Sequence, residues 1–238
     1  MQKITLILGF LTLLSPVFVQ AQSADSEKEE GFVSLFDGKT LDGWDGNPAI
    51  WSVKDGIIVG QTAKEGDAHL TYNQFLIYKG EEFGNFILKA DIKLSQNGNS
   101  GFQYRSKRNE KPWSVSGYQA DFDGIHAHSG ILYGEGYGGI LTNRGTESVL
   151  EDGPRRKSEK RFADGNELKK ELKIEDWNAY ELRVEGSQYT HIINGKVISI
   201  TNDEGEKNAK TGIIAVQAHV TNEPMRVELK NLRIKKLP

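Results

Sequence analysis

The chain has 238 residues, 26 glycines, no cysteine and a formal net charge of −3. The lack of cysteine excludes a disulfide framework, a thiol nucleophile and a lipid-modified cysteine behind a leader. A mildly acidic balance with interspersed signs gives no support for nucleic-acid binding.

The N-terminus has the pattern of a secretory signal peptide. Lys3 supplies a positive charge, residues 4–14 are apolar, and small residues before Ala21 predict cleavage after it. The apolar run is too short for a membrane span, which disfavours an uncleaved anchor. We therefore expect a periplasmic or secreted protein made of a signal peptide (residues 1–21), a flexible acidic tail (residues 22–30) and a single β-sandwich domain (residues 31–238).

Strand patterns recur at short spacing after the tail. Residues 51–59 predict a hairpin in which Asp55 and Gly56 supply the positive φ angles of a primed turn. Residues 86–95 alternate apolar and polar side chains, which indicates a half-buried strand. Residues 180–185 alternate in the same way and predict another strand.

The C-terminal third continues this pattern. Residues 189–200 predict a second hairpin, closed by an Asn-Gly turn. Terminal strands are expected over residues 212–220 and 225–234, with Asn231 marking a bulge or a change of register.

One long stretch departs from the strand pattern. Residues 147–173 are dense in charge, and we interpret them as a solvated excursion, with a helical turn over residues 166–173 as the alternative. The many short strands, glycine-rich turns and absence of strand-helix alternation predict an all-β fold. The expected architecture is a two-sheet antiparallel β-sandwich of the jelly-roll type.

Three candidate strands repeat a glutamine followed, two residues later, by an ionisable side chain. The pairs are Gln103 with Arg105, Gln119 with Asp121, and Gln217 with His219. Side chains two apart share a strand face, so neighbouring strands would combine these pairs into one polar patch. Planar polar groups beside aromatic ones are typical of ligand clefts, whereas an ordinary solvent-exposed face is the alternative.

The region with the most glycine, residues 130–139, also contains candidate ligand contacts. Tyr133 could pack against a sugar ring while Glu135 reaches its hydroxyl groups, and a flexible turn is the alternative. His219 is the best candidate for proton transfer, because the ordinary imidazole pKa lies near neutrality.

Asp121 and Asp123 keep two other kinds of site open. Two strand rises separate them by about 6.6 Å, near the spacing of roughly 6.5–9.5 Å in inverting glycosidases. An incomplete calcium-loop pattern at the same residues, followed by His126 and His128, leaves a divalent metal as an alternative. No cofactor is predicted.

Seven motifs in order span nearly the whole mature chain and resemble the 3-keto-disaccharide hydrolase family. They lie at residues 32–44 (FVSLFDGKTLDGW), 100–105 (SGFQYR), 117–121 (GYQAD), 130–135 (GILYGE), 177–180 (WNAY), 194–195 (NG) and 230–234 (KNLRI). Gly134 departs from the pattern, since close relatives carry an acidic residue before the glutamate.

The resemblance implies a concanavalin A-like sandwich that hydrolyses glycosides already oxidised at C3. A ketone at C3 acidifies the C2 hydrogen, so a base can remove it, the C1 group can leave, and water can add. The expected catalytic residues are His219 as the base, with Glu135 or Asp121 as the acid or orienting carboxylate. Arg105, with Gln103 or Gln119, would hold the carbonyl and the developing enolate. The full set of expected substrate-binding residues is Gln103, Tyr104, Arg105, Gln119, Tyr133 and Gln217.

This chemistry implies a 3-keto-sugar substrate and a functional link to a sugar 3-oxidoreductase, with no nucleic-acid partner and no membrane partner after cleavage of the signal. Two alternatives stay open. A non-catalytic carbohydrate-binding module would bind sugars without turnover, and an ordinary glycosidase using Asp121 and Asp123 would cleave unoxidised glycosides.

Overall fold

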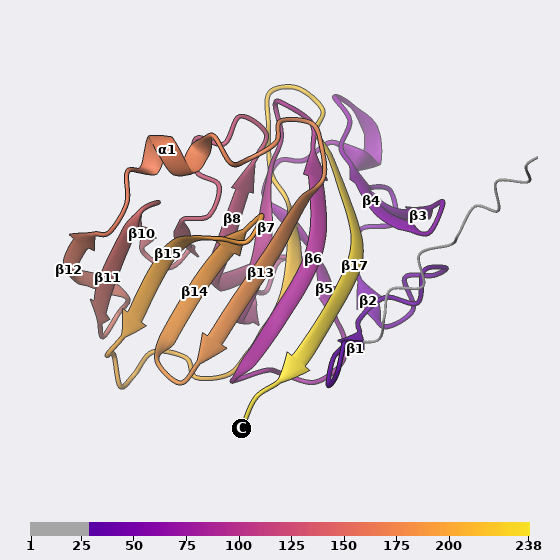
Figure 1. Cartoon of the computed structure of the whole chain (residues 1–238). Coiled ribbons are helices and arrows are strands. Elements are labelled where there is room, and N and C mark those ends of the chain that lie inside the picture. The colour runs from indigo at the N-terminus through magenta and orange to yellow at the C-terminus, as the bar shows by residue number, and fades with distance from the viewer. Residues whose placement is uncertain (1–28) are drawn as a thin grey trace, which may run out of the picture. The chain divides into compact units, whose positions relative to one another are not determined.

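Two β-sheets pack face to face in the computed structural model, which describes residues 29–238 (Figure 1). The expected signal peptide and residues 22–28 of the expected tail lie outside the described residues. The ten-stranded sheet runs, from edge to edge, through β12 (Arg155–Arg161), β11 (Thr146–Glu151), β15 (Lys196–Asp203), β14 (Gln188–Ile193), β13 (Asn178–Glu185), β6 (Phe86–Leu94), β17 (Arg226–Lys236), β4 (Ile57–Gln61) and β3 (Trp51–Lys54), and β1 (Val33–Ser34) also pairs with β17.

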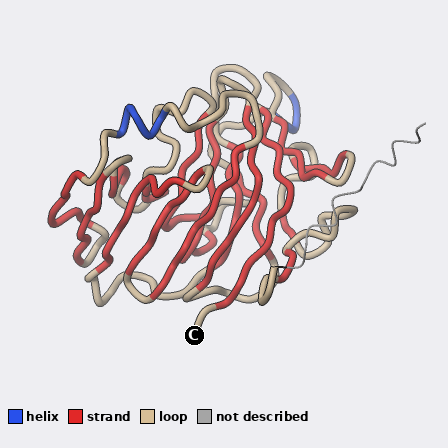
Figure 2. Tube along the Cα trace, viewed as in Figure 1, coloured by secondary structure: helices blue, strands red, loops and turns tan. Residues whose placement is uncertain are grey.

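The seven-stranded sheet covers the other side of the core. Its order is β10 (Gly139–Thr142), β9 (Leu132–Glu135), β8 (Val115–Asp123), β7 (Asn99–Arg108), β16 (Ile213–Ala218), β5 (Gln74–Tyr78) and β2 (Trp44–Asp45). Figure 2 shows how little of the described chain is helical, namely the 3-10 turn η1 (Gly66–Ala68) and the short helix α1 (Gly165–Lys169). No helix in this part of the chain is long and apolar enough to cross a membrane.

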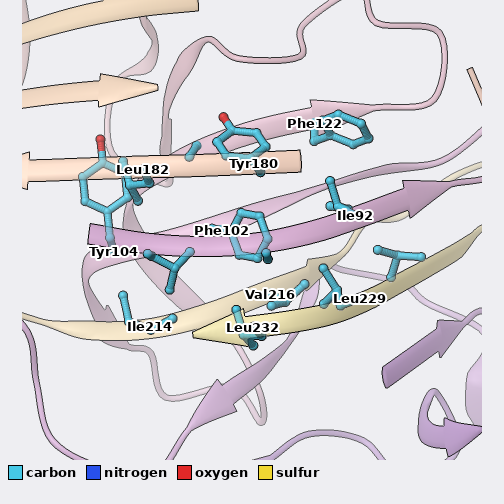
Figure 3. Packing of buried hydrophobic residues seen from close by; sticks show 14 of the residues in the cluster. Ile92, Phe102, Tyr104, Phe122, Tyr180, Leu182, Ile214, Val216, Leu229 and Leu232 are labelled. Atoms are coloured by element: carbon cyan, nitrogen blue, oxygen red, sulfur yellow. The ribbon is translucent and has the colours of Figure 1, made fainter. Parts of the chain in front are cut away.

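Period-two alternation builds the core between the sheets. Along β6 every second side chain, from Phe86 to Leu94, is buried. Phe86 packs against Tyr104 of the opposite sheet, with ring centroids 6.4 Å apart. Phe102 of that opposite sheet lies 5.4 Å from Tyr180 of β13, centroid to centroid (Figure 3). The all-β, two-sheet sandwich predicted from the sequence is therefore confirmed, with β11 and β15 as a parallel pair within otherwise antiparallel pairings of the described strands.

The predicted turns form as their residues require. Asp55 and Gly56 have φ angles of 51° and 75° between β3 and β4, and Asn194 and Gly195 have φ angles of 51° and 76° between β14 and β15. Asn231, with a φ of 54°, lies where the pairing of β17 with β6 shifts register. Both hairpins and the bulge are confirmed.

The interpretation of residues 147–173 as a solvated excursion was wrong for their first half. These residues contribute to the β11–β12 hairpin, which extends the ten-stranded sheet through the parallel pair β11–β15. Every residue of β12 is exposed, so its sequence, RRKSEKR, carries no apolar alternation from which a strand could be recognised. A charged edge strand of this kind resists pairing with another chain. The alternative helical turn appears as α1, capped by Asp164.

Candidate active site

The three glutamine-bearing strands are neighbours, with β7 between β8 and β16. Gln103 pairs with Gln119 on one side and with Ala215 on the other. Phe102 and Tyr104 belong to the core between the sheets, so strand alternation directs Gln103 to the opposite face of the sheet. The expectation that these strands lie side by side is confirmed.

A chain of hydrogen bonds joins the polar side chains on this face. The Ser106 hydroxyl donates to Gln103 Oε1 (2.6 Å), and Gln103 Nε2 donates to Gln119 Oε1 (2.8 Å). Gln119 Nε2 then donates both to Asp121 Oδ1 (2.7 Å) and to Gln217 Oε1 (3.3 Å). The donors follow one order, from Ser106 through Gln103 to Gln119, so each amide accepts at its oxygen and donates from its nitrogen. This orients each amide and holds its side chain in place.

The chain of hydrogen bonds ends at Glu135. Gln217 Nε2 donates to Glu135 Oε2 (3.1 Å), and Asn73 Nδ2 donates to Glu135 Oε1 (3.0 Å). The backbone N–H of Val220 donates to Asn73 Oδ1 (3.0 Å), which orients that amide in turn. Two donated hydrogen bonds, one to each oxygen, hold the Glu135 carboxylate in place.

A pocket of about 230 Å³ opens over this network. Six of the expected site residues line it: Gln119, Asp121, Tyr133, Glu135, Gln217 and His219. Gln103 lies one hydrogen bond behind them and is buried. The pocket thus combines carboxyl, imidazole, phenol and amide groups in a space suited to one small polar ring.

Burial changes the acid–base behaviour of Asp121. Its side chain is only 4% exposed, and burial, with further contributions from Asp123 and Glu135, raises its pKa to about 8 against the opposing hydrogen bond from Gln119. At neutral pH its carboxyl group is therefore mainly protonated. Burial, with smaller contributions from Glu135 and Asp121, also raises the pKa of Tyr133.

His219 directly follows β16 and is partly exposed at the pocket. Its Nδ1 lies 2.5 Å from the carbonyl oxygen of Val220. A carbonyl can only accept a hydrogen bond, so Nδ1 carries a proton, and in the neutral ring the lone pair lies on Nε2. The neutral ring can consequently act as a base.

Two expected substrate-binding residues lie elsewhere, which corrects the sequence interpretation. Tyr104 is fully buried in the core, with its hydroxyl 3.3 Å from His191 Nε2. Arg105 has a φ of 46° and lies within a register shift of β7, so it leaves the face of Gln103. Its guanidinium instead donates to Tyr189 Oη (2.7 Å) and to the backbone carbonyl of Gly186 (2.7 Å).

The Asp123 carboxylate binds the backbone of the loop that follows β8. Its carboxylate accepts hydrogen bonds from the backbone N–H groups of Ala127, His128 and Ser129, each 2.8 Å long. It therefore shapes the loop after β8. Within residues 29–238, no group of three or more His, Cys, Asp or Glu side chains is placed to hold a metal ion.

Several pocket residues were not among the expected catalytic or substrate-binding residues. Asn99, His128, Ile131 and Ile140 line the pocket, and Asn73 orients Glu135. None belongs to a glutamine-led pair. Asn99 is two residues before Gly101 and four before Gln103, so continuing the alternation of β7 backwards would have placed it on the same face.

Comparison with known families agrees with the motifs. The model of the 3-keto-alpha-glucoside-1,2-lyase-like domain matches residues 31–235. The chain belongs to this family.

One curated protein and two solved structures are similar to this chain. A 3-keto-disaccharide hydrolase from Bacteroides thetaiotaomicron is 36% identical over 80 residues, which cover 32% of this chain and 27% of that protein. A putative glycosyl hydrolase from Parabacteroides distasonis has a TM-score of 0.56 at 19% identity, over 90% of this chain and 97% of that one. The carbohydrate-binding module CBM66 from Bacillus subtilis has a TM-score of 0.52 at 12% identity, over 82% and 96%. These two structures are similar to this chain in fold.

Proposed function

We propose that this protein hydrolyses glycosides whose sugar carries a ketone at C3, by elimination across C1 and C2 followed by addition of water. The observation that carries the proposal is a division of proton roles within one pocket. Burial keeps the Asp121 carboxyl group mainly protonated at neutral pH, whereas the neutral ring of His219 has its lone pair on Nε2, because Nδ1 donates to the Val220 carbonyl. An elimination needs both groups at once, a base at C2 and an acid at the leaving oxygen.

The steps balance with these two side chains. His219 Nε2 takes the C2 hydrogen as a proton, the electron pair forms the C1=C2 double bond, and the C1–O bond breaks. Asp121 gives its proton to the leaving oxygen. Water then adds at C1 and returns a proton to Asp121, while the His219 imidazolium returns its proton to C2. Glu135, fixed by two amide donors, orients the sugar and the water.

The cellular setting is part of the same proposal. The signal-peptide pattern of residues 1–21 supports a periplasmic or secreted protein. A 3-keto sugar must be made by oxidation of a hydroxyl group, so a sugar 3-oxidoreductase must supply the substrate.

Matched disaccharides, one native and one oxidised at C3, test the proposal. We expect the protein to cleave only the 3-keto form, with solvent deuterium incorporated at C2 of the product. His219→Ala should lower the rate by about 10²–10⁴-fold, because a positioned base contributes that much. His69→Ala is the control, since His69 is an exposed histidine outside the pocket.

Each alternative has its own outcome. Sugar binding without turnover of either disaccharide would indicate a carbohydrate-binding module. Equal cleavage of both, with no deuterium at C2, would indicate an ordinary glycosidase.

A further inference from the structure

Asn99 differs from the other amides of the site because its side chain has no hydrogen bond to another described residue. Gln119 and Gln217 both donate to carboxyl groups, and Asn73 does the same. Asn99 Oδ1 is closed off from solvent and has no partner within the described part of the chain. The Nδ2 end is therefore the part of this amide that faces the pocket, which Asn99 lines.

Strand register places Asn99 near the proposed base. Val216 of β16 pairs with Phe102 of β7 in antiparallel sense. Continuing this register by three residues, forwards from Val216 and backwards from Phe102, places His219 opposite Asn99. Both residues line the same pocket. They are thus suited to act on adjacent carbon atoms of one sugar.

The proposed elimination requires a hydrogen-bond donor at the C3 oxygen. Removing the C2 proton moves negative charge onto that oxygen, and Arg105, which the sequence suggested for this role, is bonded to Tyr189 and Gly186 instead. Gln119 Nε2 already makes two hydrogen bonds, and the proton of Asp121 is used at the leaving group. Asn99 Nδ2, which lines the pocket and makes no hydrogen bond within residues 29–238, can supply this donor.

We propose that Asn99 Nδ2 donates a hydrogen bond to the C3 oxygen of the substrate and to the enolate oxygen that develops there. This inference rests on the proposed function and adds a catalytic residue to it. His219 removes the proton from C2 while Asn99 binds the oxygen on the neighbouring C3, so both residues take part in forming the enolate. The amide gains or loses no proton in the step.

Because the Asn99 side chain has no hydrogen-bond partner within the described protein, Asn99→Leu should affect activity and stability differently. The substitution preserves approximate shape and removes no hydrogen bond within the described protein. It also removes a buried oxygen that lacks a partner, which costs stability in the native chain. We expect the melting temperature of Asn99→Leu to equal or exceed that of the wild type while its activity falls. A structural asparagine would behave in the opposite way.

An analogue without a leaving group isolates the enolisation step. The probe is 3-keto-1,5-anhydroglucitol, which has no glycosidic oxygen substituent at C1 to expel, and proton NMR in D₂O follows exchange of its C2 hydrogen. Wild-type protein should catalyse this exchange, and Asn99→Leu should slow it by about 10²–10³-fold, the usual loss on removing one oxyanion donor. Asn166→Leu, the same change at an exposed position on α1, should leave the rate unchanged.

The outcomes separate this inference from the proposed function. If the wild type cleaves 3-keto disaccharides and Asn99→Leu exchanges C2 at the wild-type rate, Asn99 is not the donor and the function stands. A loss of activity accompanied by a lower melting temperature would instead assign Asn99 a structural role and also overturn the inference. If the wild type neither cleaves the 3-keto disaccharide nor exchanges the analogue, the proposed function fails and the role of Asn99 fails with it.

Discussion

At the residue scale, Asp121 shows how burial can change the acid–base behaviour of a common side chain. An exposed aspartate is ionised at neutral pH and cannot donate a proton. Asp121 is withdrawn from water beside two other carboxyl groups, and its pKa rises to about 8. A single donated hydrogen bond, from Gln119, opposes this shift. The residue is therefore held in the protonated form that an elimination with a poor leaving group requires.

This pKa shift predicts how stability depends on pH. The raised pKa means that the folded protein keeps the proton of Asp121 between about pH 4 and pH 8, where the unfolded chain releases it. Stability contributed by this group is thus present at low pH and lost as pH rises through that window, by up to about 1.4 kcal/mol per pH unit. Asp121→Asn should remove this pH-dependent loss of stability, because an amide does not titrate.

Urea unfolding at pH 5, 7 and 9 checks the expectation. The stability of Asp121→Asn relative to the wild type should increase with pH, whereas Asp42→Asn, at an exposed position, should show no such trend. A pH-independent difference between Asp121→Asn and wild type would show that Asp121 is ionised in the folded state.

At the element scale, the bulge in β7 separates two side chains that the sequence places together. Gln103 and Arg105 are two residues apart and would share a face in a regular strand. The register shift after Tyr104 turns Arg105 away, and its side chain then joins Tyr189 and the carbonyls of Gly84 and Gly186. This guanidinium cross-links three chain segments.

Arg105→Ala should therefore affect stability and leave catalysis unchanged. Hydrogen bonds to charged groups contribute about 1.5–3 kcal/mol each, so we expect the free energy of unfolding to fall by roughly 2 kcal/mol or more. Arg105→Lys should not restore it, because one ammonium group cannot match the forked geometry. Denaturant unfolding measures the loss, and KM and kcat of the folded variants are the control. A stable Arg105→Ala protein with a raised KM would return Arg105 to the substrate site.

At the scale of the whole molecule, the seven-stranded sheet serves two purposes. Its inner face contributes residues such as Phe102 and Tyr118 to the core shared with the ten-stranded sheet. Its outer face carries the amide network and the pocket. Because side chains alternate along each strand, a rigid core on one side fixes the polar groups on the other.

This shared core predicts that residues 29–238 unfold in one cooperative transition. Trp44 and Trp51 are buried in the same hydrophobic cluster as residues of both sheets, so their fluorescence reports on the loss of that cluster. Thermal unfolding followed by tryptophan fluorescence and by far-ultraviolet circular dichroism should give coincident curves. Two separated transitions would show that the segment contains two folding units.

Much of the fold and of the candidate site could be predicted because the relevant information is local. Alternation of side chains along 86–95 and the Asn-Gly turn at 194–195 act over a few residues, and both predictions were confirmed. The glutamine-led pairs identified Gln119, Asp121 and Gln217 for the same reason, since strand periodicity assigns a face without knowledge of the partner strand.

Only the tertiary structure decided which of these side chains meet. A bulge in β7 removes Arg105 from the site, and the pairing of strands distant in sequence brings Glu135 and Asn73 to the polar face. The same packing raises the pKa of Asp121, because desolvation depends on what covers a residue. Strand identity is thus a property of short segments, whereas the proton roles and the free amide of Asn99 arise from contacts between segments far apart in the chain.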